Sequence, residues 1–152
     1  MFSLILFFAF SCTEKEISYN YQHINEGRWY RDSLLTFRID SFQIETVNSY
    51  DISFELTTGH NYPYKDIWME VSHNLRDSLF KIDSLHYLLA DDYGKWLGSG
   101  AGGLNQFTLP YISAITLDTV QDYEIQIRQI MANDPLVGVE KIGLNTLVTK
   151  GK

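Results

Sequence analysis

Cysteine is almost absent from this sequence, which contains a single one, Cys12, among 152 residues. One thiol cannot form an internal disulfide, and it cannot supply a zinc site built from several cysteines. The histidines lack the H-x-x-x-H spacing of a helical metal site, and we expect His73 and His86 at exposed or edge positions on strands. The sequence therefore predicts no metal site and no cofactor.

Positive charge is also scarce, because 12 lysine and arginine residues stand against 19 aspartate and glutamate residues, for a net charge of −7. The basic residues are scattered singly along the chain, so no basic stripe offsets the negative balance. Nucleic-acid binding rests on lysine and arginine side chains that neutralise phosphates. The composition therefore argues against a nucleic-acid partner, and its 45% of apolar residues fits one globular domain.

No apolar run is long enough to span a membrane as a helix, which takes about 20 residues. The run at the start of the chain, MFSLILFFAFSC, has instead the length of a signal-peptide core. The small residues Ala9 and Ser11 precede Cys12, as in a bacterial lipobox, whose cysteine receives a diacylglyceryl group. We predict a lipoprotein signal peptide at residues 1–11 and lipidation of Cys12. The alternative is a buried strand with an incidental cysteine.

The predicted signal lacks the lysine or arginine that normally precedes the apolar core. Either the signal is atypical, or the reading frame continues upstream of Met1 and encodes a basic residue there. The segment after the signal is mostly polar and shows no sustained period, so we expect residues 12–27 to form the lipidated cysteine and a polar tether. The β-sandwich domain is then expected at residues 28–152.

Most of the remaining chain alternates apolar and polar residues with a period of two, which is typical of strands with one buried face. In IWMEV, for example, Ile67, Met69 and Val71 share one face. The other runs are LLTFRI (34–39), FQIE (42–45), YDISFEL (50–56), YEIQIRQIM (123–131) and IGLNTLV (142–148). With turn residues between them, about eight short strands predict an all-β fold, an antiparallel two-sheet β-sandwich of jelly-roll type.

The segment at 73–92 fits two different structures. Its leucine and isoleucine residues recur every three or four positions, which is helical spacing. The same residues also divide into two strands, with KIDS (81–84) as the turn between them. Because strand-like runs lie on both sides of this segment, we favour the two strands.

A glycine-rich stretch, GKWLGSGAGGLNQF (94–107), matches the G-x-G-x-x-G pattern of dinucleotide-binding turns through Gly98, Gly100 and Gly103. Such a turn needs a buried strand before it and a helix after it. Here the polar ADDYGKW precedes the glycines, and β-forming residues with a proline follow them, so the pattern does not predict phosphate binding. We interpret the stretch as a long loop between strands, with Trp96 as its packing anchor.

No catalytic constellation stands out in the sequence. The G-x-S-x-G pattern of a nucleophile elbow fails at Ser99, because Leu97 occupies the position two residues before it. Asp91, Asp92 and Gly94 resemble half of a calcium loop, but the alternating oxygen ligands and the final glutamate are missing, so we expect a turn. The sequence predicts a protein that is not an enzyme.

Three segments occur in a specific order: YDISFEL with NYPYKDIWMEV, then DYGKWLGSG with a later Leu-Pro, then YEIQIRQIMANDPLVGVEKIGL. Together with the lipobox-like Cys12, they resemble the family of gliding-motility lipoproteins called GldH. The resemblance implies an outer-membrane lipoprotein of gliding bacteria, needed for surface motility and linked to the type IX secretion apparatus. It implies no enzymatic activity, and it favours strands in the segment at 73–92.

We therefore expect a lipid-anchored, non-catalytic component of the gliding machinery, on the periplasmic face of the outer membrane or on the cell surface. Its partners would be the membrane, through the anchor, and other gliding or secretion proteins of the envelope. The candidate contact residues lie in the glycine loop and near it: Tyr64, Trp68, Asp91, Asp92, Lys95, Trp96, Gly98 and Gly100. The alternative is a surface glycan-binding module, in which Trp68 and Trp96 would line one open face.

Overall fold

The computed structural model describes residues 15–149, so the predicted signal peptide and Cys12 lie outside the described residues. Its regular structure is almost entirely strand, with two short 3-10 turns, η1 (Asn25–Gly27) and η2 (Ser41–Gln43). The strands are β1 (Glu16–His23), β2 (Arg28–Trp29), β3 (Leu35–Ile39), β4 (Ser49–Gly59), β5 (Asp66–His73), β6 (Lys81–Leu88), β7 (Ser99–Ala101), β8 (Leu104–Thr116), β9 (Tyr123–Gln129), β10 (Leu136–Val137) and β11 (Val139–Val148).

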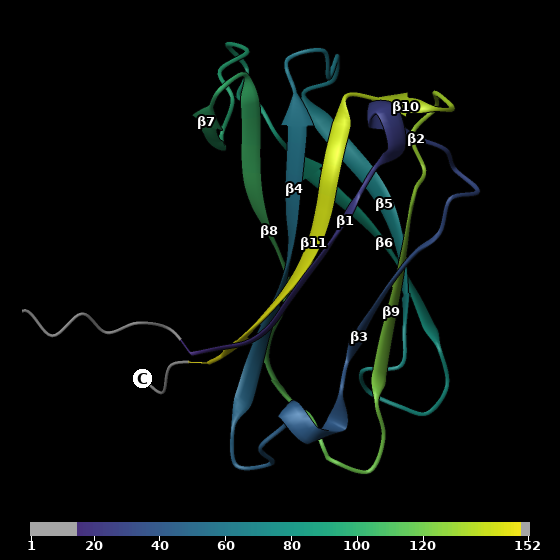
Figure 1. Ribbon diagram of the computed structural model, residues 1–152, viewed down its shortest axis with the longest axis vertical. Coiled ribbons are helices and arrows are strands. Elements are labelled where there is room, and N and C mark those ends of the chain that lie inside the picture. Colours follow the sequence, from purple (N-terminus) through teal and green to yellow (C-terminus); the bar gives the residue numbers. More distant parts are fainter. Residues whose placement is uncertain (1–14, 150–152) are drawn as a thin grey trace, which may run out of the picture.

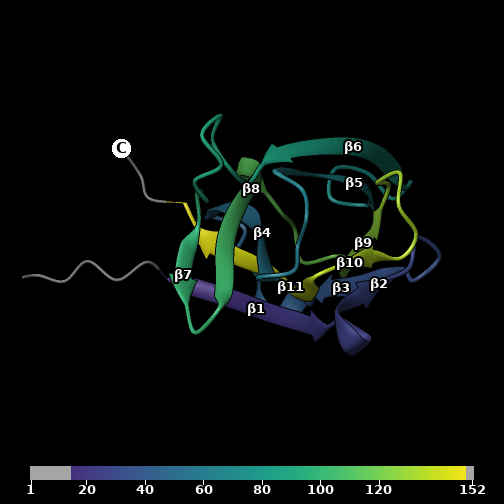
Figure 2. The same cartoon turned by 90° about the horizontal axis from the view of Figure 1, so that it is seen from above.

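The long strands form two sheets that face each other (Figure 1). A five-stranded sheet has the order β1-β11-β4-β8-β7, and a four-stranded sheet has the order β3-β9-β5-β6. Figure 2 shows the two layers from above, with β6 and β5 opposite β1 and β11. The short strands β10 and β2 pair with each other, and all strand pairs are antiparallel.

The strand pairs are nested, which defines the topology of the sandwich. Among the eight longer strands, the first pairs with the last (β1 with β11), and the next pairs inward are β3 with β9, β4 with β8, and β5 with β6. A chain folded as one long hairpin and then wrapped into two sheets gives this order, which is that of a jelly roll. The predicted β-sandwich with about eight main strands is confirmed.

The core lies between the two sheets, as the period-two patterns predict. Ile67 and Val71 from the four-stranded sheet and Phe54 from the five-stranded sheet are fully buried. Burial of each such side chain contributes on the order of 2 kcal/mol. Trp29 is also fully buried, and its indole N–H donates a hydrogen bond to the Ser33 carbonyl oxygen at 2.9 Å. The polar atom of this tryptophan is therefore satisfied inside the core.

The folded domain begins at Glu16 rather than at residue 28, which corrects the expected tether. Strand β1 pairs with β11 along its whole length, from Glu16 to His23, with one irregularity in register near its start. A segment hydrogen-bonded along one edge of a sheet is part of that sheet, not a flexible linker. Only residues 13–15 remain between the predicted lipidated cysteine and the first strand.

The sequence of β1 shows no apolar alternation because its inward-facing residues are polar. Ser18 is buried, and Asn20 and Gln22 lie on the same side of the strand. The Gln22 amide donates to the Thr36 carbonyl oxygen at 2.7 Å, and the Asn20 amide donates to the Arg38 carbonyl oxygen at 3.4 Å. These bonds join β1 to β3, so amide side chains close one open side of the sandwich.

The segment at 73–92 contains one strand, β6, and neither a helix nor two strands. KIDS, expected as a turn, is the first half of β6. The helical spacing of the leucines does not mark one buried face. Leu75 packs into the core, whereas Leu79 lies exposed in the loop before β6. As an edge strand, β6 pairs only with β5, so its pattern lacks a continuous buried face.

The run FQIE also differs from its expected strand, because it contains the 3-10 turn η2. The N–H of Ser41 donates to the Asp122 carboxylate at 2.7 Å. At the other end, the N–H of Glu45 donates to the Tyr50 hydroxyl at 2.7 Å, and that hydroxyl donates to the Glu45 carbonyl oxygen at 3.0 Å. These side-chain partners take the hydrogen bonds of the Ser41 and Glu45 backbone groups, so the segment needs no neighbouring strand there.

Candidate functional site

The connection between β6 and β7, residues 89–98, folds back on itself as a tight turn. The N–H of Asp91 donates to the Lys95 carbonyl oxygen at 2.9 Å, and the N–H of Gly94 donates to the Asp91 carbonyl oxygen at 3.0 Å. The Asp91 carboxylate accepts hydrogen bonds from the N–H groups of Tyr93 and Lys95, both at 2.9 Å. The expected turn is confirmed, and the Asp91 side chain stabilises it.

Trp96 anchors this connection, as the sequence predicts. Its ring is partly buried, with centroids 6.1 Å from Phe107 and 6.5 Å from Tyr62. Tyr62 meets Tyr64 edge-on at 5.8 Å, and its hydroxyl donates to the Asp66 carbonyl oxygen at 2.7 Å. Burial raises the pKa of Tyr62, so the hydroxyl stays protonated as a donor. Four aromatic rings therefore form one cluster under the 89–98 connection.

Trp68 lies elsewhere, on the outer face of the four-stranded sheet. It is 43% exposed and stacks on His86, with ring centroids 4.2 Å apart and an interplanar angle of 13°. His86 Nε2 lies 2.8 Å from Asp66 Oδ2. Trp68 and the partly buried Trp96 do not share one open face, and Trp29 is fully buried. The tryptophan platform on which the glycan-binding alternative depended is therefore not formed.

The remaining predicted contact residues lie on the exposed rim of the 89–98 connection. The Asp92 side chain is 98% exposed, and its carboxylate lies 4.0 Å from the Lys65 ammonium, which is a weak surface contact. Lys95 is exposed, and Gly100 is exposed within β7. The structure thus groups Tyr64, Asp91, Lys95 and Trp96 near this connection, whereas it places Trp68 on another face.

The second half of the glycine-rich stretch is a β-hairpin, which corrects the interpretation of the whole stretch as a loop. Strand β7 pairs with β8, with Ser99 opposite Gln106 and Ala101 opposite Leu104. The two residues between these strands, Gly102 and Gly103, have φ values of 60° and 81°. A two-residue type I′ turn needs positive φ at both central positions, so this glycine pair sets the register of the hairpin.

A partly buried polar network, which the sequence did not reveal, joins the two sheets. His73 is only 2% exposed, so its expected edge position is wrong. Its Nδ1 accepts a hydrogen bond from the N–H of Leu75 at 3.1 Å, which assigns the ring proton to Nε2, 3.3 Å from the Asp83 carboxylate. The Tyr111 hydroxyl donates to the same carboxylate at 2.6 Å. Burial and Asp83 raise the pKa of Tyr111.

A second tyrosine spans the same side of the sandwich. The Tyr87 hydroxyl on β6 donates to the Pro110 carbonyl oxygen on β8 at 2.8 Å, and burial raises the pKa of Tyr87 to about 12. Together with the bond from Tyr111 to Asp83, it links the edge of the four-stranded sheet to β8 in the other sheet. These tyrosines gain their role only because β6 in one sheet packs against β8 in the other, so sequence spacing carried no signal for it.

The family of the chain follows from comparison with known proteins. The family model described as GldH lipoprotein matches residues 16–146. The chain belongs to the GldH lipoprotein family. A gliding motility lipoprotein GldH homolog from Christiangramia forsetii is 27% identical over 143 residues, covering 93% of this chain and 85% of that protein. The gliding motility lipoprotein GldH of Flavobacterium johnsoniae is 25% identical over 134 residues, covering 88% and 81%. No solved structure matches the chain.

The GldH match agrees with the extent of the folded domain. It begins at Glu16, the first residue of β1, and ends at Thr146 in β11, the strand that pairs with β1. The GldH family is a lipoprotein family implicated in gliding motility, which places its members at a membrane of the cell envelope. The resemblance found in the sequence is therefore confirmed. The name of the family is that of a lipoprotein family and not of an enzyme family.

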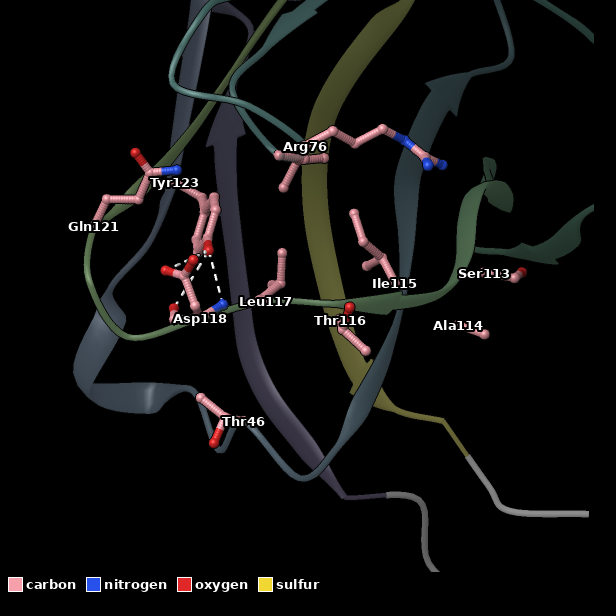
Figure 3. Close-up of a pocket in the computed structure, with 11 residues that line it drawn as sticks. Thr46, Arg76, Ser113, Ala114, Ile115, Thr116, Leu117, Asp118, Gln121 and Tyr123 are labelled. Atoms are coloured by element: carbon pink, nitrogen blue, oxygen red, sulfur yellow. Dashed lines mark hydrogen bonds between the residues drawn. The ribbon is translucent and has the colours of Figure 1, made fainter.

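The GldH-family domain contains a cavity of about 630 Å³ beside the end of β8 (Figure 3). Arg76 lies on one side of it and residues 113–118 form another wall, and Leu75 also lines it. Asp118 accepts hydrogen bonds from the Tyr123 hydroxyl at 3.2 Å and from the N–H of Val120 at 3.0 Å. Among residues 15–149, no histidine, cysteine or lysine lines this cavity. The Asp118 carboxylate stabilises the turn that follows β8.

Other chemical signals are also missing from the described part of the GldH-family chain. Within residues 15–149, no group of three or more histidine, cysteine, aspartate or glutamate side chains is placed to hold a metal ion. In the same part of the chain, no helix has the length and apolar character needed to cross a membrane.

One carboxyl group on the outer face of the five-stranded sheet, that of Glu55, has a pKa above its usual range. Glu55 accepts a hydrogen bond from the Thr108 hydroxyl at 2.9 Å. Partial burial nevertheless raises the pKa of Glu55. The ionised carboxylate is therefore less favourable in the folded chain than in the unfolded chain. Stability contributed by this group is highest at low pH and is lost as the pH rises through the folded-state pKa.

Glu55→Gln is accordingly expected to raise the melting temperature at pH 7, by a few degrees at most. The gain should disappear as the pH falls below the ordinary glutamate range, where the native side chain is also neutral. Circular dichroism melts between pH 7 and pH 4 measure this difference. Asp92→Asn, at an exposed position, is the matched control and should show no pH-dependent gain. A lower melting temperature of Glu55→Gln at pH 7 would contradict the expectation.

Proposed function

We propose that this chain is a lipid-anchored, non-catalytic component of the gliding machinery, linked to type IX secretion and acting through protein contacts at the outer membrane. The observation that carries the proposal is the GldH family match over residues 16–146. The lipobox-like sequence before Cys12 supports the anchor.

The physical mechanism is tethering. Between Cys12 and Glu16 only three residues intervene, so a fully extended chain holds the first strand within about 14 Å of the lipidated cysteine. Acyl chains inserted in the membrane fix the domain at its surface. A partner in the same membrane then meets the domain at a high effective concentration, so a modest contact area is sufficient for stable assembly.

The protein contact is placed at the exposed rim of the 89–98 connection. Leu88, Tyr93 and Leu97 are 59%, 97% and 60% exposed there, and we call these three residues the contact rim. Leu88 and Leu97 also line a cavity of about 320 Å³ that reaches Phe107 on β8. Exposed apolar side chains gathered beside a cavity are typical of interaction sites. Asp92 and Lys95 lie beside the rim and supply charge of both signs.

The decisive experiment is deletion of the gene in the bacterium that carries it, followed by complementation. Deletion is expected to abolish colony spreading and to reduce secretion of type IX cargo, and the intact gene should restore both. The variant Leu88→Asp/Leu97→Asp should restore neither, because two carboxylates would have to be desolvated in the contact. Val120→Asp is the matched control, since Val120 is 83% exposed in the turn between β8 and β9. It should restore both activities.

Two results would contradict the proposal at different levels. Normal spreading and normal secretion after deletion would remove the role in gliding altogether. Full complementation by the double aspartate variant, at the same protein level as the control, would remove the contact rim but leave the family role in place. Melting temperatures of the purified variants establish that both substitutions leave the domain folded.

A further inference from the structure

Strongly exposed apolar side chains gather at one end of the sandwich. Phe42 and Val47, in the connection between β3 and β4, are 83% and 89% exposed. Leu79 and Val120, in the β5–β6 and β8–β9 connections, are 78% and 83% exposed. These three connections lie at the lower end of the molecule in Figure 1, whereas β7 lies at the upper end. A single exposed apolar residue is ordinary, but a group of them at one end is typical of a contact surface.

The chain enters the sandwich at this same end. Strand β1 begins beside the end of β11, and Val148 of β11 is opposite Tyr50 near the start of β4. The connection that leads into β4, residues 40–48, therefore lies close to the start of β1, and we call it the anchor-side loop. Three residues separate Cys12 from Glu16. The acyl chains of a lipidated Cys12 thus enter a bilayer within a short reach of this loop.

Side-chain contacts fix the anchor-side loop to the strand that carries the anchor. The Lys15 ammonium lies 3.0 Å from the Glu45 carboxylate, and the Gln43 amide donates to the Ile17 carbonyl oxygen at 3.1 Å. The hydrogen bond and the charge of Lys15 lower the pKa of Glu45, so this carboxylate stays ionised and paired. The pair adds no net charge to the loop. An apolar surface can therefore approach the loop without meeting an unpaired charge at this position.

The other two exposed apolar side chains lie further from β1. The N–H of Ser41 donates to the Asp122 carboxylate at 2.7 Å, which places the β8–β9 connection beside the anchor-side loop. The Asn74 amide donates to the Asp122 carbonyl oxygen at 3.3 Å, which places the start of the β5–β6 connection beyond it. Val120 and Leu79 are thus one and two connections away from the loop. Of the three connections, the anchor-side loop is the one that these bonds tie to β1.

The fold itself does not require apolar side chains at the tips of the anchor-side loop. The N–H of Asn48 donates to the Glu45 carbonyl oxygen at 2.9 Å, which closes a four-residue turn with Val47 at its third position. Glycine, asparagine, aspartate and serine are the usual residues of such turns, not a β-branched one. Neither Phe42 nor Val47 belongs to the core or to the partly buried residues packed against it. An ordered turn therefore holds both side chains out into the surroundings.

We propose that Phe42 and Val47 insert into the lipid bilayer beside the acyl chains of Cys12, so that the anchor-side loop orients the domain on the membrane. The inference rests on the lipid anchor of the proposed function. Two side chains bury too little apolar surface to hold a protein on a bilayer by themselves, so the acyl chains anchor the domain and the loop orients it. Because the chain has a net charge of −7, the contact is apolar and needs no anionic lipid.

This orientation directs the contact rim away from the bilayer. Ser49 at the start of β4 is opposite Thr116, whereas Gly59 at its end is opposite Leu104, beside the β7–β8 hairpin. The strand has 11 residues, so the two ends of the sandwich are separated by about 35 Å. A partner therefore meets the contact rim in the aqueous compartment and not among the lipid headgroups.

A protein partner fits the anchor-side loop less well than a bilayer does. The three residues between Cys12 and Glu16 keep this end of the domain close to the membrane surface. A partner bound to Phe42 and Val47 would have to enter the narrow space between the domain and the bilayer. Lipid already fills that position, and it accepts apolar side chains without a specific shape.

The test places a fluorescent probe in the loop of the full-length lipidated protein. Thr46→Cys adds the single thiol that is not lipidated, and a nitrobenzoxadiazole label on it leaves Phe42 and Val47 in place. The labelled protein is reconstituted in phosphatidylcholine vesicles that contain a phospholipid with a nitroxide on its acyl chain. The nitroxide should quench this label about threefold more strongly than the same label on Tyr93→Cys, which lies at the opposite end of the sandwich.

Substitutions then assign the quenching to the two apolar side chains. Phe42→Asp/Val47→Asp, in the Thr46→Cys background, should reduce quenching to the level seen with Tyr93→Cys, because carboxylates resist transfer into lipid. Val120→Asp is the matched control, since it changes a side chain of similar exposure in the next connection, and it should leave the quenching unchanged. High salt should also leave it unchanged, because the contact is apolar. Melting temperatures verify that each variant is folded.

Flotation of the same vesicles separates the possible failures. Protein that does not float with the vesicles would show that Cys12 is not a lipid anchor, which removes the anchor of the proposed function and this inference with it. Protein that floats but shows equal quenching at Thr46→Cys and Tyr93→Cys would overturn the membrane contact alone. A loss of quenching in Val120→Asp as large as that in the double variant would overturn the assignment to the anchor-side loop.

Discussion

Replacing Cys12 with alanine is expected to release the protein completely from the membrane fraction. The thiol of Cys12 is the acceptor of the diacylglyceryl group in the predicted lipobox, and the sequence contains no second cysteine that could replace it. The proposal requires the acyl chains on this cysteine to hold the domain at the membrane. Incorporation of labelled palmitate, followed by membrane fractionation, measures the effect.

The matched control for this experiment is Ser11→Ala. It changes the neighbouring residue but keeps a small side chain before the cysteine, so labelling and membrane association should continue. Labelled fatty acid in Cys12→Ala at the native level would show that the lipobox prediction is wrong. Loss of label together with normal gliding would separate the anchor from the function, and would mean that the contact rim alone localises the domain.

The central strands of the fold could be predicted from sequence because each carries its own pattern. Tyr123, Ile125 and Ile127 of β9 alternate with polar residues, and all three are buried, since both neighbours of this strand lie in the same sheet and one face meets the core. A period of two is then imposed by the local geometry of the strand. The jelly-roll class followed from the number and spacing of such runs.

The edge strands β1 and β6 could not be predicted, because their inward-facing residues include polar side chains at the border of the sandwich. These side chains form hydrogen bonds there instead of packing in the apolar core. In β1, the amides of Asn20 and Gln22 bond to the backbone of β3. In β6, the inward-facing residue Asp83 is polar, and its carboxylate is hydrogen-bonded by His73 and Tyr111. Polar residues at these positions look like loop or tether in a sequence, and only the partner strand, distant in the chain, makes them structural.

The candidate site, like the fold, could be predicted from the sequence only in part. The packing role of Trp96 was predictable, since its large apolar ring is the side chain in a glycine-rich stretch that can bury most surface against the domain. Its grouping with Tyr62 and Tyr64 depends on the fold bringing the connection between β4 and β5 close to β8, from different parts of the chain. The exposure of Tyr19 and Tyr21 on one face of β1 was not predicted, because this segment was interpreted as a tether rather than as a strand.

Gly98→Ala is expected to be the most damaging single substitution in the glycine-rich stretch. A Cβ atom at this position would collide with the Gln106 carbonyl oxygen and lie 2.7 Å from Cδ1 of Phe107. The carbonyl belongs to the backbone of β8, which is held between β4 and β7 and cannot move away cheaply. We expect a loss of about 3 kcal/mol in the free energy of unfolding, as for a severely overpacked site.

Gly100→Ala is the matched control, two residues further along the same stretch. The nearest atom to its added Cβ would be the Asn105 side-chain oxygen at 3.6 Å, an ordinary contact, so the change should be within about 0.5 kcal/mol. Urea unfolding of both variants measures the difference. Equal stability of the two would contradict the close crossing of Gly98 over β8. Because Leu97 is adjacent to this crossing, Gly98→Ala should also displace the contact rim and reduce colony spreading, whereas Gly100→Ala should support it.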